Sequence, residues 1–184
     1  MRYRFEEIAD EHRKVYQAID KEMLSGFASL VGAHSRLFFI GVGREGLQTR
    51  AFAMRMTHMG KEAHWVWDDT TPCIGHGDLL IATSGSGDIG HIDYVCRQAK
   101  EAGAKVAVIT GSPSGKTARD ADFVLFIPAC VYKGTDEVVP SVQPMGNLFE
   151  QCLLVVLDAV VMAMVEQSDS LTFEKMAMRH RNVE

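Results

Sequence analysis

Five short runs rich in apolar residues, separated by segments with helical periodicity, constrain the fold of this chain more than any other feature. They cover residues 37–40, 63–67, 78–83, 105–110 and 123–127. Strands that are apolar on both faces must be covered on both faces, which is typical of a parallel sheet between layers of helices. The pattern therefore predicts an α/β fold.

The segments between these runs predict the helices. From Phe5 to Phe27, apolar residues recur at three- and four-residue steps, which predicts one helix over about the first thirty residues. Further helices are expected over 45–59, 89–102, 145–165 and, near the C-terminus, 171–181. A chain of 184 residues with 47% hydrophobic and 23% charged residues is long enough for one well-buried core.

Charge and cysteine content exclude several classes of function. A formal net charge of -5 provides no basic field for nucleic acid or for an anionic membrane. No stretch is expected to span a bilayer, since the best candidate, residues 152–165, is short and contains Asp158. The four cysteines form no CxxC pair, and no histidine spacing indicates a metal. We expect a cytoplasmic protein that binds neither nucleic acid nor membrane.

Three glycine- or serine-rich turns follow predicted strands, over residues 41–46, 84–87 and 111–115. The carboxyl ends of parallel strands meet at one edge of the sheet, where helix N-termini present unpaired backbone N–H groups. These turns therefore predict that the ligand site lies at this edge.

Two of the turns resemble nucleotide-binding motifs. Residues 41–46 fit GxGxxG, and Asp68 follows at the distance of a ribose-binding acid, but tight glycine turns also occur where a helix and a strand approach closely. Residues 111–117 have three residues between the glycines where a P-loop has four, and Pro113 removes a backbone donor. We interpret the second turn as a polar loop.

The turn after the third strand favours phosphate binding. Ser84, Gly85 and Ser86 combine two hydroxyl donors with a flexible backbone directly before a helix. The alternative is an ordinary capped helix with a flexible entry loop.

Two further residues are candidates for chemistry. Glu150 lies near the start of the apolar helix expected over 145–165. There it either stabilises the helix by interacting with the positive end of the helix dipole or acts as a partly desolvated base. His180 lies almost at the chain end, where side chains usually have no role.

Together these segments resemble the sugar isomerase (SIS) domain family, and within it the hexuloisomerase branch. The likeness covers nearly the whole chain. It depends on the segments at residues 41–44, 51–60, 70–72, 77–87, 144–150 and 179–184.

The resemblance implies a three-layer αβα sandwich with a five-stranded parallel sheet, of the flavodoxin-like or Rossmann-like kind. It implies a single SIS domain over 1–184, with an N-terminal helix over 1–30, a sheet core over 35–166 and a C-terminal tail helix over 170–184. It also implies a tetramer that converts 3-hexulose 6-phosphate to fructose 6-phosphate through a cis-enediol, with no metal or organic cofactor.

The resemblance also implies roles for particular residues. The residues expected to be catalytic are Glu150 as base, Arg44 facing the sugar, and His180 entering a neighbouring subunit's site. The residues expected to bind the substrate are Gly43, Arg44, Ser84, Gly85, Ser86 and Asp88.

Three positions depart from the family pattern: Glu45 stands where a serine is common, and Asp88 and Ile89 stand where the phosphate loop commonly ends in Glu-Thr. Two alternatives therefore accompany the hexuloisomerase hypothesis: a non-catalytic phosphosugar-binding module, and an isomerase of another sugar phosphate such as arabinose 5-phosphate.

The apolar faces of the first helix and of the 145–165 helix are larger than one small sheet covers, which predicts a homo-oligomer.

Overall fold

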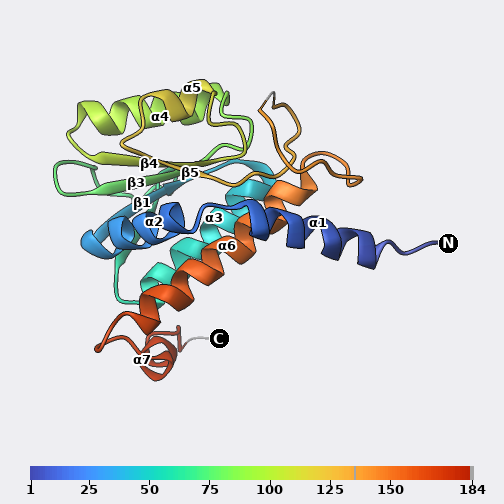
Figure 1. The fold of residues 1–184 in the computed structure, drawn as a ribbon. Helices are drawn as coiled ribbons and strands as arrows, with labels where there is room; N and C mark the ends of the chain where they lie inside the picture. The colour runs from blue at the N-terminus through green and yellow to red at the C-terminus, as the bar shows by residue number, and fades with distance from the viewer. Residues whose placement is uncertain (135, 183–184) are drawn as a thin grey trace.

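The computed structural model describes residues 1–134 and 136–182. Helices and strands alternate along most of the chain (Figure 1). Their order is α1 (Phe5–Ala18), α2 (Lys21–Ala33), β1 (Arg36–Ile40), α3 (Gly43–His58), β2 (Glu62–Trp65), β3 (Leu79–Thr83), α4 (Gly90–Glu101), β4 (Lys105–Thr110), α5 (Lys116–Arg119), β5 (Phe123–Phe126), α6 (Asn147–Glu166) and α7 (Phe173–Met178).

The sheet confirms the predicted architecture. Its five strands run in the order β2-β1-β3-β4-β5, and every neighbouring pair is parallel. The strand order reverses direction between β1 and β3, which is the position where open α/β sheets bind their ligands.

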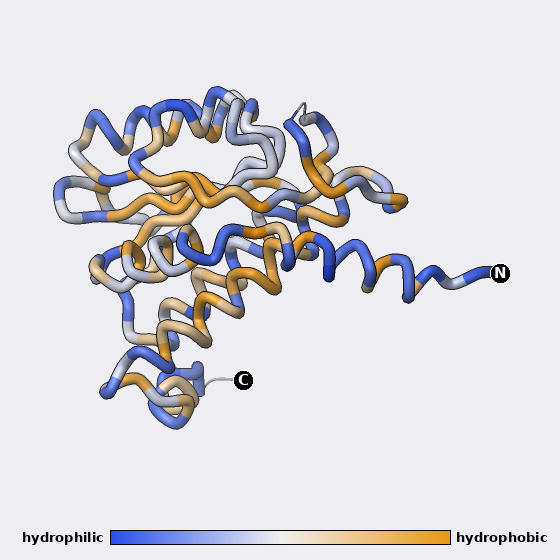
Figure 2. The backbone as a smooth tube through the Cα atoms, viewed as in Figure 1, coloured by the Kyte–Doolittle hydropathy of each residue, from blue (hydrophilic) through white to orange (hydrophobic). Residues whose placement is uncertain are grey.

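Helices cover both faces of the sheet, so the fold is a three-layer αβα sandwich (Figure 1). Alternate side chains of β1 point to opposite faces: Leu37 and Phe39 join the core beneath α2, α3 and α6, whereas Phe38 and Ile40 join the core beneath α4. Both sets are buried, which explains why β1 is apolar from Leu37 to Ile40 (Figure 2).

The N-terminal segment differs from the prediction of a single helix. α1 ends at Ala18, and Asp20 then begins α2, because its carboxylate accepts hydrogen bonds from the N–H groups of Glu22 and Met23. Since the break changes the chain direction, α1 packs against α6 while α2 packs against β5 as well as α6.

α6 corrects the expectation that no stretch is long and apolar enough to cross a membrane. The helix begins at Asn147, earlier than the stretch considered in the sequence, and its 20 residues are sufficient by length and composition. Half of the apolar window is buried inside the protein, and core helices of soluble proteins pass the same test.

A buried carboxylate fixes the connection between β5 and α6. Glu11 of α1 is only 7% exposed and accepts hydrogen bonds from Ser141 Oγ, Val142 N and Gln143 Nε2 at 2.6–2.9 Å. Three donors compensate for the burial of the charge and hold the pKa of Glu11 below its usual value, against the effect of burial. α1 therefore holds the segment that leads into the ligand edge.

Removing the buried charge at the other edge of the sheet should destabilise the fold. Asp78 is 4% exposed, receives two hydrogen bonds from Arg36 at 2.6 and 2.7 Å and one from Gly75 N. We expect Asp78→Asn to lower the free energy of unfolding by about 2–4 kcal/mol at pH 7 in urea titrations. Asp169→Asn, at an exposed position, should change it by less than about 0.5 kcal/mol.

The same contact predicts a pH dependence. Arg36 holds the pKa of Asp78 below its usual value, so the folded protein binds this proton less readily than the unfolded chain. The stabilisation is therefore complete above the unfolded pKa and is lost as the pH falls below about 4. An Asp78→Asn deficit that stayed constant down to about pH 2 would contradict this assignment.

Candidate active site

The predicted ligand edge is formed by the segments that follow β1, β3, β4 and β5. Their described residues are 41–46, 84–88, 111–115, 127–134 and 136–146. We refer to residues 84–88 as the serine loop.

The glycine turn after β1 serves close packing. A Cβ on Gly41 would lie 2.3 Å from Thr83 Oγ1, and one on Gly46 would lie 2.7 Å from the Gly41 oxygen. Gly43 adopts a positive φ of 56°. These contacts favour the tight-turn interpretation of the GxGxxG pattern, and Asp68 is paired with Arg50 at 3.2 Å.

The two serines of the serine loop have different environments. Ser84 has no exposed surface, and no described residue forms a hydrogen bond with its Oγ. Ser86 is partly exposed and lines the cavities at the sheet edge, and its Oγ accepts the N–H of Asp88 at 3.4 Å. The structure therefore brings Ser86 and Asp88 to the cavity and buries Ser84, which is not among the residues that line it.

α4 begins directly after the serine loop. Its N-cap residue is Ile89, and no side chain accepts a hydrogen bond from the first turn. The unpaired N–H groups of a helix N-terminus favour an anion. Ser86 and this helix end thus provide donors of two kinds beside one cavity.

The serine loop packs backbone against backbone on the loop after β4. A Cβ on Gly115 would lie 2.6 Å from Gly87 Cα, and Thr117 N donates to the Gly87 oxygen at 2.8 Å. This contact requires glycine at both positions. Close packing therefore explains both glycines of the motif at residues 111–117: Gly115 lies against the serine loop, and a Cβ on Gly111 would lie 2.5 Å from Val131 Cγ1 in the segment after β5.

Positively charged side chains lie around the contact between the two loops. The sequence analysis did not identify them as candidate site residues. A cavity of about 490 Å³ is lined by Lys116, Arg119 and Lys133, together with Ser86 and other polar residues of the two loops. Ser112 Oγ and Ser114 Oγ, in the loop after β4, both donate to the carboxylate of Asp136. No motif marks Lys133, because it belongs to an irregular segment whose position depends on the tertiary fold.

A strained turn sets the position of Glu150. Met145 has φ of 60° and Gly146 has φ of 80°, and a Cβ on Gly146 would lie 2.8 Å from Tyr132 N. α6 starts at the next residue and points its first turn at the edge of the sheet. This turn lies in the segment at residues 144–150, which is one of those on which the family resemblance depends.

Glu150 and Arg44 form the charged pair of the site. Glu150 is 14% exposed, and its Oε2 lies 2.8 Å from Arg44 Nη1. That nitrogen donates instead to Asn147 Oδ1, and Glu150 Oε2 accepts no hydrogen bond from the described residues. A largely buried carboxylate oxygen that accepts no hydrogen bond has its lone pairs available to accept a proton.

Glu45 contributes a second carboxylate to this place. From the first turn of α3 its Oε2 accepts the N–H of Gly85 at 2.8 Å. Burial and the charge of Glu150 raise the pKa of Glu45 to about 7, although the bond from Gly85 opposes the shift. From the sequence, Glu45 is visible only as a departure from the family pattern, because the residue that it bonds, Gly85, lies forty positions away.

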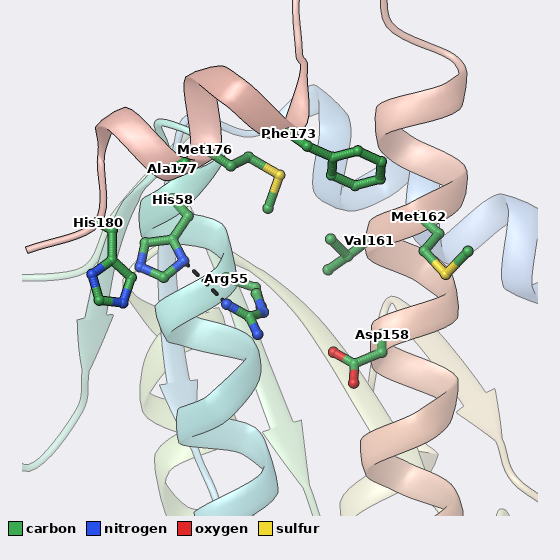
Figure 3. A pocket seen from close by; sticks show the side chains of 9 residues that line it. All are labelled: Arg55, His58, Asp158, Val161, Met162, Phe173, Met176, Ala177 and His180. Atoms are coloured by element: carbon green, nitrogen blue, oxygen red, sulfur yellow. Dashed lines mark hydrogen bonds between the residues drawn. The ribbon is translucent and has the colours of Figure 1, made fainter.

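His180 lies far from Glu150 of the same chain. Its ring centroid is 5.2 Å from that of His58, and both line a cavity of about 460 Å³ between α3, α6 and α7 (Figure 3). Val161 of α6 lines this cavity eleven residues after Glu150, a separation of about 16 Å along a helix. Within one chain the structure brings together Arg44, Gly85, Ser86, Asp88 and Glu150, and leaves His180 apart.

The fold and this edge define the class of the protein. The model of the SIS domain family matches residues 29–141. The chain belongs to the SIS domain family.

Relatives within that class are similar over nearly the whole chain. The 3-hexulose-6-phosphate isomerase of Bacillus subtilis is 34% identical over 97% of this chain and 96% of its own, and that of Mycobacterium gastri is 37% identical over 97% and 87%. The solved structure of a Methanococcus jannaschii protein, with the inferred function of 3-hexulose-6-phosphate isomerase, has a TM-score of 0.84 at 26% identity and covers 97% of this chain and 98% of that chain.

Proposed function

We propose that this chain is a phosphosugar isomerase that converts 3-hexulose 6-phosphate to fructose 6-phosphate. The observation that carries the proposal is the Glu150 carboxylate, largely buried beside Arg44 at the ligand edge of an SIS fold. Relatives that bear this activity in their names match the chain over almost its full length, which supports the choice of substrate. Formation of fructose 6-phosphate by the purified protein tests it.

The reaction moves a carbonyl from C3 to C2. Glu150 removes the proton from C2, the C–H electrons form the C2–C3 double bond, and the carbonyl electrons move to the oxygen on C3. Protonation of that oxygen and loss of the proton on the C2 oxygen give the C2 carbonyl, while Glu150 returns its proton to C3. Arg44 places a positive charge beside the oxygens on which the negative charge develops.

In this proposal the phosphate of the substrate binds at the serine loop. Ser86 and the first turn of α4 supply hydrogen-bond donors, and Lys133 supplies a positive charge at the same cavity. Binding a group remote from the reacting carbons orients C2 and C3 toward Glu150. Asp88 lines the same cavity, and Gly85 and the buried Ser84 belong to the same loop. We propose that Gly43, in the turn after β1, binds the substrate together with them.

We also propose that residues 1–184 act as one SIS domain in a cytoplasmic homotetramer. Leu47 and Met54 of α3 are exposed and seven residues apart, as are Val155 and Met162 of α6, so each pair presents an apolar stripe on one helix face. Such stripes are suited to burial between subunits. In this assembly His180 acts at the site of a neighbouring subunit.

Complementation between inactive variants tests the role of His180. We expect Glu150→Gln and His180→Ala each to abolish most of the activity as pure oligomers. When the two chains are produced together, mixed oligomers contain sites with Glu150 from one chain and His180 from the other. Random mixing should then restore about a quarter of the wild-type activity per site.

The same experiment distinguishes this arrangement from one in which His180 acts at the site of its own chain. If His180 served Glu150 of its own chain, every site in a mixed oligomer would lack one of the two residues, and mixing would restore nothing. Light scattering on the same samples checks that the chains associate. A monomer at micromolar concentration would contradict the proposed assembly.

A further inference from the structure

The Glu45 carboxylate lies directly on the backbone of the serine loop. Glu45 Oε2 accepts a hydrogen bond from the N–H of Gly85 at 2.8 Å, and a Cβ on Gly85 would lie 2.5 Å from Glu45 Oε1. A carboxylate oxygen on a loop N–H takes the place that an oxygen of a bound anion would otherwise occupy. Glu45 therefore already supplies an anion to this loop from within the chain.

Charged groups from several elements face this carboxyl. Glu150 of α6 repels it, Asp88 of the serine loop and Lys133 of the segment after β5 line the same cavity of about 390 Å³, and Tyr132 closes one side. Arg44 precedes Glu45 on α3 but pairs with Glu150. The carboxyl is largely removed from solvent and is repelled by Glu150, an arrangement in which protonation relieves both the repulsion and the desolvation.

We propose that Glu45 competes with the anionic group of the substrate for the serine loop and thereby sets the affinity of the site and its dependence on pH. The inference rests on the proposed function, because it takes the serine loop as the phosphate site. An ionised Glu45 holds the Gly85 N–H and repels an incoming dianion. A protonated Glu45 releases this N–H and itself donates to an oxygen of the anion.

This competition makes anion binding a proton-linked process. The pKa of Glu45 is near 7, so both forms are present at neutral pH. A ligand that binds only the protonated form takes up a proton when Glu45 is ionised, and its apparent affinity falls as the pH rises above that pKa. Between about pH 6 and pH 8.5 the affinity should decrease about thirtyfold.

Calorimetric titration with sulfate tests the inference, because sulfate remains a dianion over this range whereas a sugar phosphate titrates. For the wild-type protein we expect weakening with rising pH and, at about pH 8, uptake of up to one proton, measured in buffers of different ionisation enthalpy. Glu45→Gln and Glu45→Ser should bind sulfate about tenfold more tightly at about pH 8, with an affinity that changes less than about threefold across the range. Glu101→Gln, which removes a charge from the exposed end of α4, should behave as the wild type.

Two kinds of result would overturn the inference, and they can be told apart because only the second removes the phosphate site as well. Wild-type binding that is independent of pH, or Glu45 variants that keep the wild-type slope, would remove the competition while leaving the phosphate site intact. If neither sulfate nor fructose 6-phosphate bound to the wild type or the variants at any pH, the serine loop would not be an anion site, and the proposed function would fail with it.

Discussion

Glu150→Gln should lower kcat for hexulose 6-phosphate about 10²- to 10⁴-fold and change KM by less than about threefold. Glutamine keeps the size of the side chain but cannot accept the C2 proton. Arg44 Nη1 also donates to Asn147 Oδ1, a bond that the substitution keeps, so the cation stays in place for the oxygens of the sugar. Steady-state kinetics measure kcat and KM, and calorimetry with fructose 6-phosphate measures binding.

Glu166→Gln is the matched control, since it makes the same change at the exposed end of the same helix. It should leave both constants unchanged within about twofold. If Glu150→Gln retained more than about a tenth of the activity, Glu150 would not be the base. If binding persisted but the wild-type protein also lacked turnover, the chain would be a phosphosugar-binding module.

Gly115→Ala should separate the two loops that form the phosphate end of the site. Gly115 has φ of −65°, which alanine adopts without strain, so the whole effect comes from the new Cβ, 2.6 Å from Gly87 Cα. We expect the free energy of unfolding to fall by about 1–3 kcal/mol. Phosphosugar affinity should fall at least about tenfold, because the serine loop must shift.

Gly32→Ala provides the control for this substitution. No atom lies within 4 Å of a Cβ at Gly32 in α2, so alanine there should stabilise the protein by about 0.5–1 kcal/mol through its higher helix propensity. Urea unfolding and calorimetry measure both variants. Equal stability and affinity for Gly115→Ala and the wild type would show that the contact between the loops is not needed.

Much of the fold follows from the sequence because burial on both faces leaves a strong local pattern. β1, β3 and β4 appear as apolar runs, and the glycine and serine turns after them mark the ligand edge. The break between α1 and α2 is less visible, since the apolar spacing continues from Ile19 to Met23. The cap at Asp20 is a local signal that could have located it.

The details of the site depend on contacts that no local pattern contains. Which of Ser84 and Ser86 faces the cavity is set by the conformation of the serine loop, and Ser84 is the buried one. The bond between Glu45 and Gly85 joins residues forty positions apart. Lys133 lines the cavity from an irregular segment after β5, and Glu11 of α1 bonds a later part of the same segment, at residues 141–143.

The most direct test of the account is a coupled assay with the purified wild-type protein. Hexulose 6-phosphate, formed enzymatically from ribulose 5-phosphate and formaldehyde, is supplied as substrate, and fructose 6-phosphate is followed through glucose-6-phosphate isomerase and its dehydrogenase. The account predicts turnover with a kcat on the order of 1 s⁻¹ or more, within the range of ordinary enzymes. A folded protein that gave no fructose 6-phosphate, with the coupling enzymes verified, would contradict it.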